Sequence, residues 1–563
     1  MLSNPVIRRL VCLALTSLSS AQSSSNRVAQ IESVYADVND AYGAMSAIDS
    51  GLAKSYAGKN GVQWKTVYRE RRRELVAELK SAPNKGLSNE DERAVSVMRR
   101  GLEDLPESSA SSTQQGWKCK DSLRKTLAYA GLREALDACF EEVGNNLHFE
   151  GKTVSRLTVF GLLTQIEEPE RRKAAFLAFA PLWQAIDGKD EQDSPYRRVI
   201  GMAADAAKKH SSAIEDAART VGVKPDEVER WLEQILDKWR RVSGDQPIEP
   251  WDFWYRAGET DRKLASAIPR ESMQPLNERY YHDLGADLKQ LGILYDLDPR
   301  PGKAPVAYTD FVTRGRTIDG VWHRSVMRVC ASYASGGLGL LNEFVHENGH
   351  AIHGAALHTR PAFMGMGDSL FVEAFADVTS WSTYEPAWQR RYLGQEAPEV
   401  ASVRSLYSSV MMDVAWALFE IRMLRNPKAD PNVEWTEITN RYLHVVAHPE
   451  WSWWAVRGQL VEAPGYMVNY GLGAVLTADL REHIRETFGA FDSGNPAWYG
   501  WISERLLRQG EEHPTAEVLR EFLGRPISPV SLLSEIGRIQ GSRVAEVTCC
   551  AVPKVTWATP IAD

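Results

Sequence analysis

The sequence predicts a mainly α-helical fold with one small antiparallel sheet. Over most of the 563 residues, apolar side chains recur three and four positions apart with charged residues between them, which is the helical repeat. The one clear strand signal is 321–333, where β-branched and aromatic residues precede a Ser-Gly-Gly break at 335–337. A composition of 44% hydrophobic and 25% charged residues suits a large folded protein with an ample core.

The first 21 residues have the pattern of an export signal. Arg8 and Arg9 precede a short apolar run, and small residues up to Ala21 follow it. We therefore expect residues 1–21 to be removed and the protein to be secreted or periplasmic. The mature chain, 22–563, is expected to form one helical catalytic unit with an N-terminal part of about 27–245 and a second part of about 246–563.

Charge and cysteine usage exclude other classes of protein. The net charge of −8 and the absence of a lysine- or arginine-dense block give no footprint for nucleic acid. No stretch after the leader reaches about 18 consecutive apolar residues, so we expect no membrane span. The six cysteines show no Cys-x-x-Cys spacing. An exported chain would allow a disulfide between Cys119 and Cys139, which the sequence leaves open.

A candidate metal motif lies in the predicted helix 340–354, with the sequence His346-Glu347-Asn348-Gly349-His350. Residues four apart share a helical face, so the two imidazoles can chelate a single ion. A zinc ion with an open coordination position activates water, and the Glu347 carboxylate beside it can accept and return a proton. The motif therefore predicts one zinc ion and a hydrolase.

A third ligand is predicted on the next helical stretch, 371–377, after a loop at 360–367. Glu373 and Asp377 share a face there, so Glu373 can bind the metal while Asp377 bonds a ligand imidazole. The alternative is an exposed acidic pair. His353 and Ala356 stand where a metzincin would have glycine and a third histidine, which excludes that class.

These two helices together resemble the gluzincin metallopeptidases of the thimet oligopeptidase and angiotensin-converting enzyme types. The aromatic segment 250–255 and His353 are similar to the former, whereas Ser382, Pro386 and 324–330 are similar to the latter. The resemblance spans about 250–480. It implies a large helical ellipsoid with a deep substrate channel for short peptides, and a 321–333 strand beside the zinc-binding helix that pairs with the extended substrate.

The resemblance also implies groups opposite the zinc. Tyr466 and Tyr470, four apart, would donate to the oxyanion; the alternative is that they are core tyrosines. Arg457 stands about where the converting-enzyme type has a cation for the substrate carboxylate, and a surface arginine is the alternative. The histidine expected a few residues before the tyrosines is missing, since the nearest are His444 and His448.

Taken together, the sequence predicts an exported zinc metallopeptidase that acts on short peptides, as an oligopeptidase or a peptidyl-dipeptidase. The ligands are His346, His350 and Glu373, and Glu347 is the general base and acid. One rival is a catalytically impaired peptide-binding protein that retains the same channel, which the missing histidine suggests. Another is a zinc hydrolase that acts on a non-peptide amide.

Overall fold

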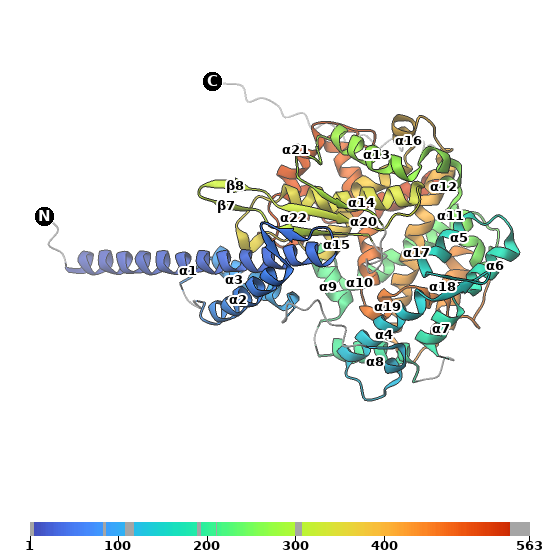
Figure 1. The fold of residues 1–563 in the computed structure, drawn as a ribbon, viewed down its shortest axis with the longest axis horizontal. Helices are drawn as coiled ribbons and strands as arrows, with labels where there is room; N and C mark the ends of the chain where they lie inside the picture. Colours follow the sequence, from blue (N-terminus) through green and yellow to red (C-terminus); the bar gives the residue numbers. More distant parts are fainter. Residues whose placement is uncertain are drawn as a thin grey trace, which may run out of the picture.

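The computed structural model describes residues 5–82, 86–106, 117–188, 193–209, 211–298 and 307–540. Helices make up most of this part of the chain, as Figure 1 shows. The helices of the first 245 residues are α1 (Pro5–Asp49), α2 (Gly61–Lys80), α3 (Asn89–Asp104), α4 (Tyr129–Gly144), α5 (Arg156–Gln165), α6 (Pro169–Leu177), α7 (Ala180–Asp187), α8 (Pro195–Ala207), α9 (Ala213–Val221) and α10 (Pro225–Val242).

The second part of the chain is also helical, which confirms the predicted fold class. Its helices are α11 (Pro250–Ala257), α12 (Glu259–Leu264), α13 (Arg270–Asp283), α14 (Leu338–Ala356), α15 (Ser369–Ser380), α16 (Pro386–Leu393), α17 (Glu399–Arg425), α18 (Pro431–Leu443), α19 (Gln459–Glu462), α20 (Met467–Thr487), α21 (Trp498–Ile502), α22 (Thr515–Leu523) and α23 (Val530–Gly537). Within it, α15 packs against both α14 and α20, and α17 packs on α20.

The buried apolar side chains form two clusters. The larger one runs from Leu132 to Ile539 and includes helices from both sides of residue 245. The smaller one is formed by α1, α2 and α3 together with Ala362 and Phe363 from the segment between α14 and α15. Burial of apolar surface is the main favourable term in folding, so these clusters hold α1–α3 as a separate layer against the helical body.

The strands are short and form small sheets. They are β1 (Ser55–Tyr56), β2 (Lys59–Asn60), β3 (Leu147–Phe149), β4 (Lys152–Val154), β5 (Leu294–Asp296), β6 (Tyr308–Thr313), β7 (Arg316–Ile318), β8 (Val321–His323) and β9 (Val326–Cys330). The pairs β1-β2, β3-β4 and β7-β8 are antiparallel hairpins, and the remaining three strands form a sheet of order β5-β9-β6.

The three-stranded sheet corrects two details of the sequence interpretation. It is mixed, because β5 pairs with β9 in parallel while β6 pairs with β9 antiparallel. The predicted strand 321–333 is divided into β8 and β9, and β9 is the central strand. Because β9 is paired with β5 on one side and with β6 on the other, it is not available to pair with an extended substrate. In this sheet the edge strand next to α14 is β6.

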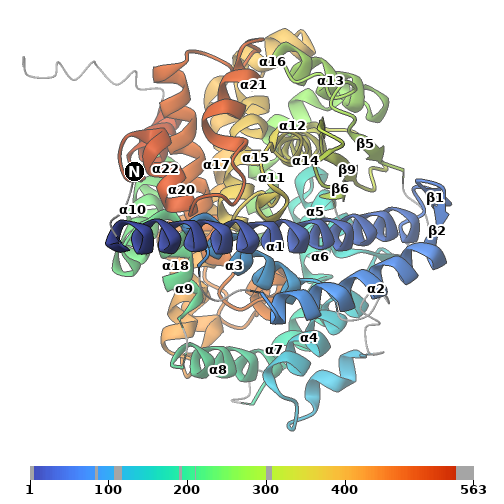
Figure 2. The same cartoon turned by 90° about the vertical axis from the view of Figure 1, so that its left-hand side faces the viewer.

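The sheet lies between α1 and α14. The paired residues Asp310 on β6 and Arg328 on β9 point to α1, where Arg328 Nη1 donates to Ser46 O at 3.2 Å. Thr309, the next residue along β6, points the other way, to Glu347 on α14. In Figure 2, α1 runs across the near face of the molecule, and β6, β9 and α14 are seen directly above it. This layering places β6 beside the metal-binding motif.

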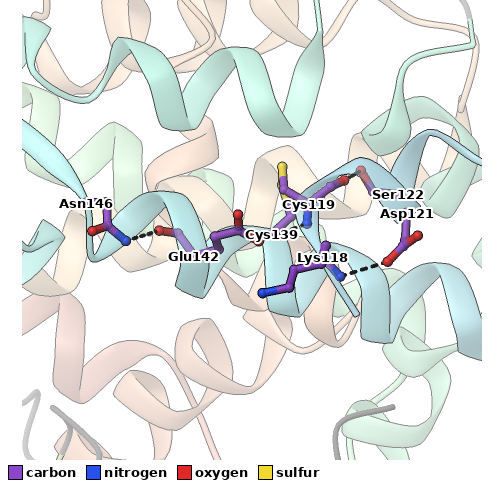
Figure 3. Close-up of a disulfide and its surroundings, with 7 residues drawn as sticks. All are labelled: Lys118, Cys119, Asp121, Ser122, Cys139, Glu142 and Asn146. Atoms are coloured by element: carbon purple, nitrogen blue, oxygen red, sulfur yellow. Dashed lines mark hydrogen bonds between the residues drawn. A yellow bond between two sulfur atoms is a disulfide. The ribbon is translucent and has the colours of Figure 1, made fainter. Parts of the chain in front are cut away.

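Cys119 and Cys139 form a disulfide that joins the start of a short 3₁₀ turn, Cys119–Leu123, to α4 (Figure 3). The pairing is the one that the sequence allowed. The adjacent Cys119 N–H donates to Glu142 Oε2 at 3.1 Å, which adds a second link between the turn and α4. Among the helices of the described segments, none combines the length and the apolar character that crossing a bilayer requires.

The predicted leader 1–21 and the division near residue 245 both stay predictions. Residues from Pro5 onward belong to α1, which continues to Asp49 and whose N-terminal end projects away from the body in Figure 1.

Candidate metal centre

The site is built on α14, whose start is fixed by a carboxylate from another helix. Gly337 precedes α14 with a φ of 125°, a conformation that favours glycine. Asp261 Oδ1, from α12, accepts the backbone N–H groups of Leu338 and Gly339. Buried N–H groups at a helix start need such acceptors, so this contact satisfies them and anchors the helix.

The motif's glycine lets the two ligand-bearing helices touch. A Cβ atom at Gly349 would lie 2.7 Å from Ala376 Cα and 2.9 Å from Ala376 O, so only glycine permits this approach of α14 to α15. Tyr281 on α13 fastens the same pair, because its hydroxyl lies 2.6 Å from Val345 O and 2.8 Å from Thr379 Oγ1. The crossing brings the predicted ligands of both helices to one place.

Three donor atoms converge at this crossing. His346 Nε2 lies 3.1 Å from His350 Nε2 and 3.3 Å from Glu373 Oε2, and the His350–Glu373 distance is 3.9 Å. Tetrahedral zinc with bonds of about 2.0–2.2 Å has ligand atoms roughly 3.3–3.6 Å apart. Two imidazole nitrogens and one carboxylate oxygen at this spacing therefore fit a zinc ion.

The groups around the two imidazoles also suit a cation. His346 Nδ1 bonds Asp377 Oδ1 at 2.7 Å, which leaves Nε2 to face the other donors. Burial acts to lower the pKa of His346, but the Asp377 and Glu373 carboxylates raise it well above its usual value. Burial lowers the pKa of His350 to about 3, so this ring is neutral and one of its nitrogens carries a lone pair that can bind a metal.

A second carboxylate lies beside the imidazoles. Glu347 brings a carboxylate oxygen within 4.8 Å of donor atoms of both histidines. Because Glu347 Oε2 is bonded to Thr309 while Glu373 Oε2 faces both imidazoles, at 3.3 Å and 3.9 Å, we expect Glu373 to be the third ligand. Burial acts to raise the pKa of Glu373, but the hydrogen bond and the charge of His346 outweigh burial and lower this pKa below its usual value. A carboxyl group must be ionised to bind a metal, so the shift suits a ligand.

Glu347 is held in place by the edge strand β6. Thr309 Oγ1 on β6 lies 2.8 Å from Glu347 Oε2 and 2.9 Å from its backbone oxygen. Burial raises the pKa of Glu347 to about 7, although His346 and Thr309 act in the opposite direction. A carboxyl group with such a pKa can both accept and return a proton near neutral pH. Sequence reasoning missed Thr309, although the β-branched run 308–313 carries a strand signal.

Tyr466 and Tyr470 lie at the start of α20, on the α15 side of the centre. Their ring centroids are 5.7 Å apart. Burial raises the pKa of Tyr466 to about 12, with a further contribution from Glu373, and burial also raises the pKa of Tyr470. Both hydroxyls therefore keep their protons at neutral pH and remain hydrogen-bond donors.

A buried glutamate that sequence reasoning missed holds the start of α20. The helix has no side-chain cap of its own at Tyr466. Instead Glu420 Oε2, from α17, accepts the backbone N–H of Met467 at 2.9 Å, and the Glu420 side chain is fully buried. Burial raises the pKa of Glu420 to about 8, so the hydrogen bond itself, more than a negative charge, fixes the turn that presents Tyr466. No local spacing signals this contact between residues 47 positions apart.

Arg457 lies on the Tyr470 side of the pair. Its guanidinium carbon is 4.7 Å from the Tyr470 ring centroid and 5.4 Å from the Trp416 ring, and its Nη2 is 3.0 Å from Asp413 Oδ1. The Arg457 side chain is 22% exposed, so it is a partly buried, positioned cation instead of a surface arginine.

The nearest histidines are bound elsewhere. His448 lies between Glu450 and Glu249, at 2.8 Å and 3.0 Å, and His444 Nε2 contacts Arg240 O at 3.0 Å. Neither of them replaces the missing histidine, and the cation beside Tyr470 is Arg457.

Comparisons with known proteins give the fold. No protein-family model and no curated protein matches the sequence. Similar solved structures include PZ peptidase A with an inhibitor, with a TM-score of 0.56, 16% identity, and coverage of 91% of this chain and 96% of that chain. They also include an M32 carboxypeptidase from Deinococcus radiodurans R1 with a TM-score of 0.53, 15% identity, and coverage of 92% and 100%.

Metallocarboxypeptidase 1 of Trypanosoma cruzi is similar to the same degree, with a TM-score of 0.53, 14% identity, and coverage of 92% and 100%. Each of the three likenesses covers at least 91% of this chain and at least 96% of the other chain. The chain therefore adopts the fold of large helical metallopeptidases, and it carries a His-Glu-x-x-His cluster at the crossing of α14 and α15.

Proposed function

We propose that this chain is an exported zinc-dependent peptidase that hydrolyses short peptides. One observation carries the proposal: His346 Nε2, His350 Nε2 and Glu373 Oε2 converge within 3.9 Å beside a second carboxylate, Glu347. These three residues would hold one zinc ion, and Asp377 would orient His346. Bound zinc supplies Lewis acidity, which makes water a better nucleophile and polarises the peptide carbonyl.

The residues of the chain carry the proton transfers. Glu347 accepts a proton from the attacking water and returns it to the amine that leaves, and Thr309 keeps the carboxylate in place during both steps. The Tyr466 and Tyr470 hydroxyls donate to the carbonyl oxygen as it gains negative charge. Such donors are most effective when they are fixed beforehand, and Glu420 fixes the turn that carries Tyr466.

We further propose that cleavage occurs near the C-terminus of the peptide. Arg457 is the cation next to Tyr470, and a guanidinium binds a carboxylate with two parallel hydrogen bonds. Asp413 binds Nη2 of Arg457, so the other N–H groups of the guanidinium can donate hydrogen bonds to a ligand. The names of two of the similar structures describe carboxypeptidases, which supports this direction.

Export of the protein is supported by two features of the chain. One is the signal-like sequence of residues 1–21. The other is the Cys119–Cys139 disulfide, since disulfides persist mainly in oxidising compartments. A secreted or periplasmic peptidase would meet short peptides as its substrates.

The missing histidine favours one rival, a peptide-binding protein that has lost catalysis. Such a protein would have no need of a base, yet Glu347 is buried, bonded to Thr309 and placed beside both imidazoles. This arrangement supports catalysis over binding alone.

Mass spectrometry of products from a mixed peptide pool tests the proposal. Each peptide is supplied with a free C-terminal carboxylate and as the C-terminal amide. We expect products cut near the C-terminus, with kcat/KM lower for the amides by about tenfold or more because the charge-assisted bonds to Arg457 are lost. Arg457→Gln should remove this preference. Internal cleavage without regard to the terminus would contradict the Arg457 role, and absence of any product would contradict the peptidase itself.

A further inference from the structure

A cavity opens next to the tyrosine pair. It has a volume of about 340 Å³, and Tyr466 and Ser369 lie in its wall. Ser369 is one helical turn before the ligand Glu373 on α15, so the cavity begins beside the metal centre. The opposite wall comes from α9, including Ala217 and Thr220. The volume lies within the range of ligand pockets, about 300–1,000 Å³.

A second cavity, of about 520 Å³, lies next to the first. The two share the wall residues Tyr129, Ala213 and Pro464, so they adjoin each other, and we call the pair the distal groove. The second part lies between α8, α9 and the start of α10, and in Figure 1 α4, α8 and α19 gather at the same end of the molecule.

The wall of the second part is unusual in composition. It is made largely of small and apolar side chains, namely Ala203, Ala204, Ala206, Ala207, Ala213, Ile214, Pro225, Leu424 and Pro464. Alanines leave depth in a wall that larger side chains would fill. The carboxylates of Glu215 and Asp226 and the guanidinium of Arg425 also line it. An apolar pocket with a few polar groups is the usual form of a site for an apolar ligand group.

We propose that the distal groove binds the N-terminal part of an extended peptide substrate, and that its alanine-lined part receives a bulky apolar side chain remote from the cleaved bond. This inference rests on the proposed peptidase function and adds a substrate class to it: oligopeptides with an aromatic or large aliphatic residue towards the N-terminus. Dipeptides would be too short to reach it.

The direction of the peptide follows from the two ends of the site. Arg457 packs against Tyr470, whereas the distal groove is lined by Tyr466, one turn earlier on α20. The two tyrosines thus separate the cation from the groove. If the C-terminal carboxylate binds at Arg457, the chain that extends past Tyr466 is the N-terminal part of the peptide. Thr220 and Asn469 line this path and offer hydrogen bonds to its backbone.

A substitution that fills the groove tests the inference. Ala206 is half-buried on the last turn of α8 and lines the second part. The variant Ala206→Trp is compared with wild type on peptides that share one C-terminal sequence and are lengthened at the N-terminus one residue at a time, with Phe or Ser at the new position. The matched control is Ala174→Trp, at an exposed position on α6.

In wild type, kcat/KM should rise when Phe reaches the groove and should rise less with Ser. For Ala206→Trp the ratio of kcat/KM for long Phe peptides to that for the shortest peptide should fall about tenfold or more, as expected for a filled apolar pocket. Ala174→Trp should keep the wild-type ratio. An unchanged ratio in Ala206→Trp, or a gain from C-terminal lengthening instead, would overturn the inference.

Binding separates this inference from the proposed function. Fluorescence titration of Glu347→Gln with the same peptides measures affinity without turnover. Tighter binding of long Phe peptides by Glu347→Gln, lost in the double variant with Ala206→Trp, supports the groove even if wild type hydrolyses nothing. Equal affinity for all lengths overturns the groove even if hydrolysis is found.

Discussion

Replacement of Glu347 by glutamine is expected to abolish peptide hydrolysis while the zinc stays bound. Glutamine keeps the size of the side chain and an oxygen that can accept a hydrogen bond from Thr309. In the wild-type protein, Thr309 Oγ1 lies 2.8 Å from Glu347 Oε2. It cannot take up and return a proton, so kcat/KM should fall by about 10²–10⁴-fold or more. Steady-state kinetics on one cleaved peptide, with zinc measured by mass spectrometry on the same sample, checks both halves of the result.

The matched control is Glu437→Gln, an exposed glutamate on α18 far along the chain from the motif. This variant should keep wild-type kinetics and zinc. Wild-type turnover by Glu347→Gln would remove Glu347 from the mechanism. Loss of zinc along with activity would instead mean that Glu347 is a ligand, in the place assigned here to Glu373.

Replacement of Arg328 by methionine is expected to cause the largest loss of stability. The Arg328 side chain is fully buried, and it pairs with Asp310 at 2.5 Å and donates to Ser46 Oγ at 2.9 Å. Methionine would remove these bonds and leave Asp310, whose side chain is 28% exposed, without its partner; since a hydrogen bond to a charged group contributes about 1.5–3 kcal/mol, we expect a loss of about 3 kcal/mol. The shift of the urea midpoint, converted with the wild-type slope, measures the loss.

Arg316→Met provides the comparison, since Arg316 also pairs with α1, through Asp37 at 2.8 Å and Asp40 at 2.6 Å, but is 25% exposed. Partly exposed pairs contribute about 0.2–1 kcal/mol each, so a smaller shift is expected. Equal shifts of the urea midpoint for the two variants would show that burial of Arg328 does not determine how much its contacts with α1 contribute to the free energy of unfolding.

The candidate metal ligands could be brought together from sequence alone because local periodicity determines which side chains share a helical face. Four-residue spacing places His346 and His350 on one face of a helix, and the same spacing places Glu373 and Asp377 on one face of the next. The helical fold class follows from the same repeat. Neither inference needs knowledge of contacts between distant parts of the chain.

The surroundings of the ligands depend on such distant contacts, and sequence reasoning missed them. Thr309 reaches Glu347 only because β6 takes the outer position of the sheet, and strand order has no local signal. Glu420 reaches the start of α20 from α17. The predicted 321–333 strand had the right β character, yet its pairing on both sides removed the role we expected for it.

The central claim is that His346, His350 and Glu373 hold a zinc ion on which peptide hydrolysis depends. It is tested most directly by following hydrolysis and metal content together while zinc is removed from the full chain by a chelator and then restored. We predict about one zinc ion per chain, as a three-ligand catalytic site binds. Activity should disappear with the zinc and return when zinc is added back. Peptide hydrolysis that persists in the metal-free chain would contradict the claim.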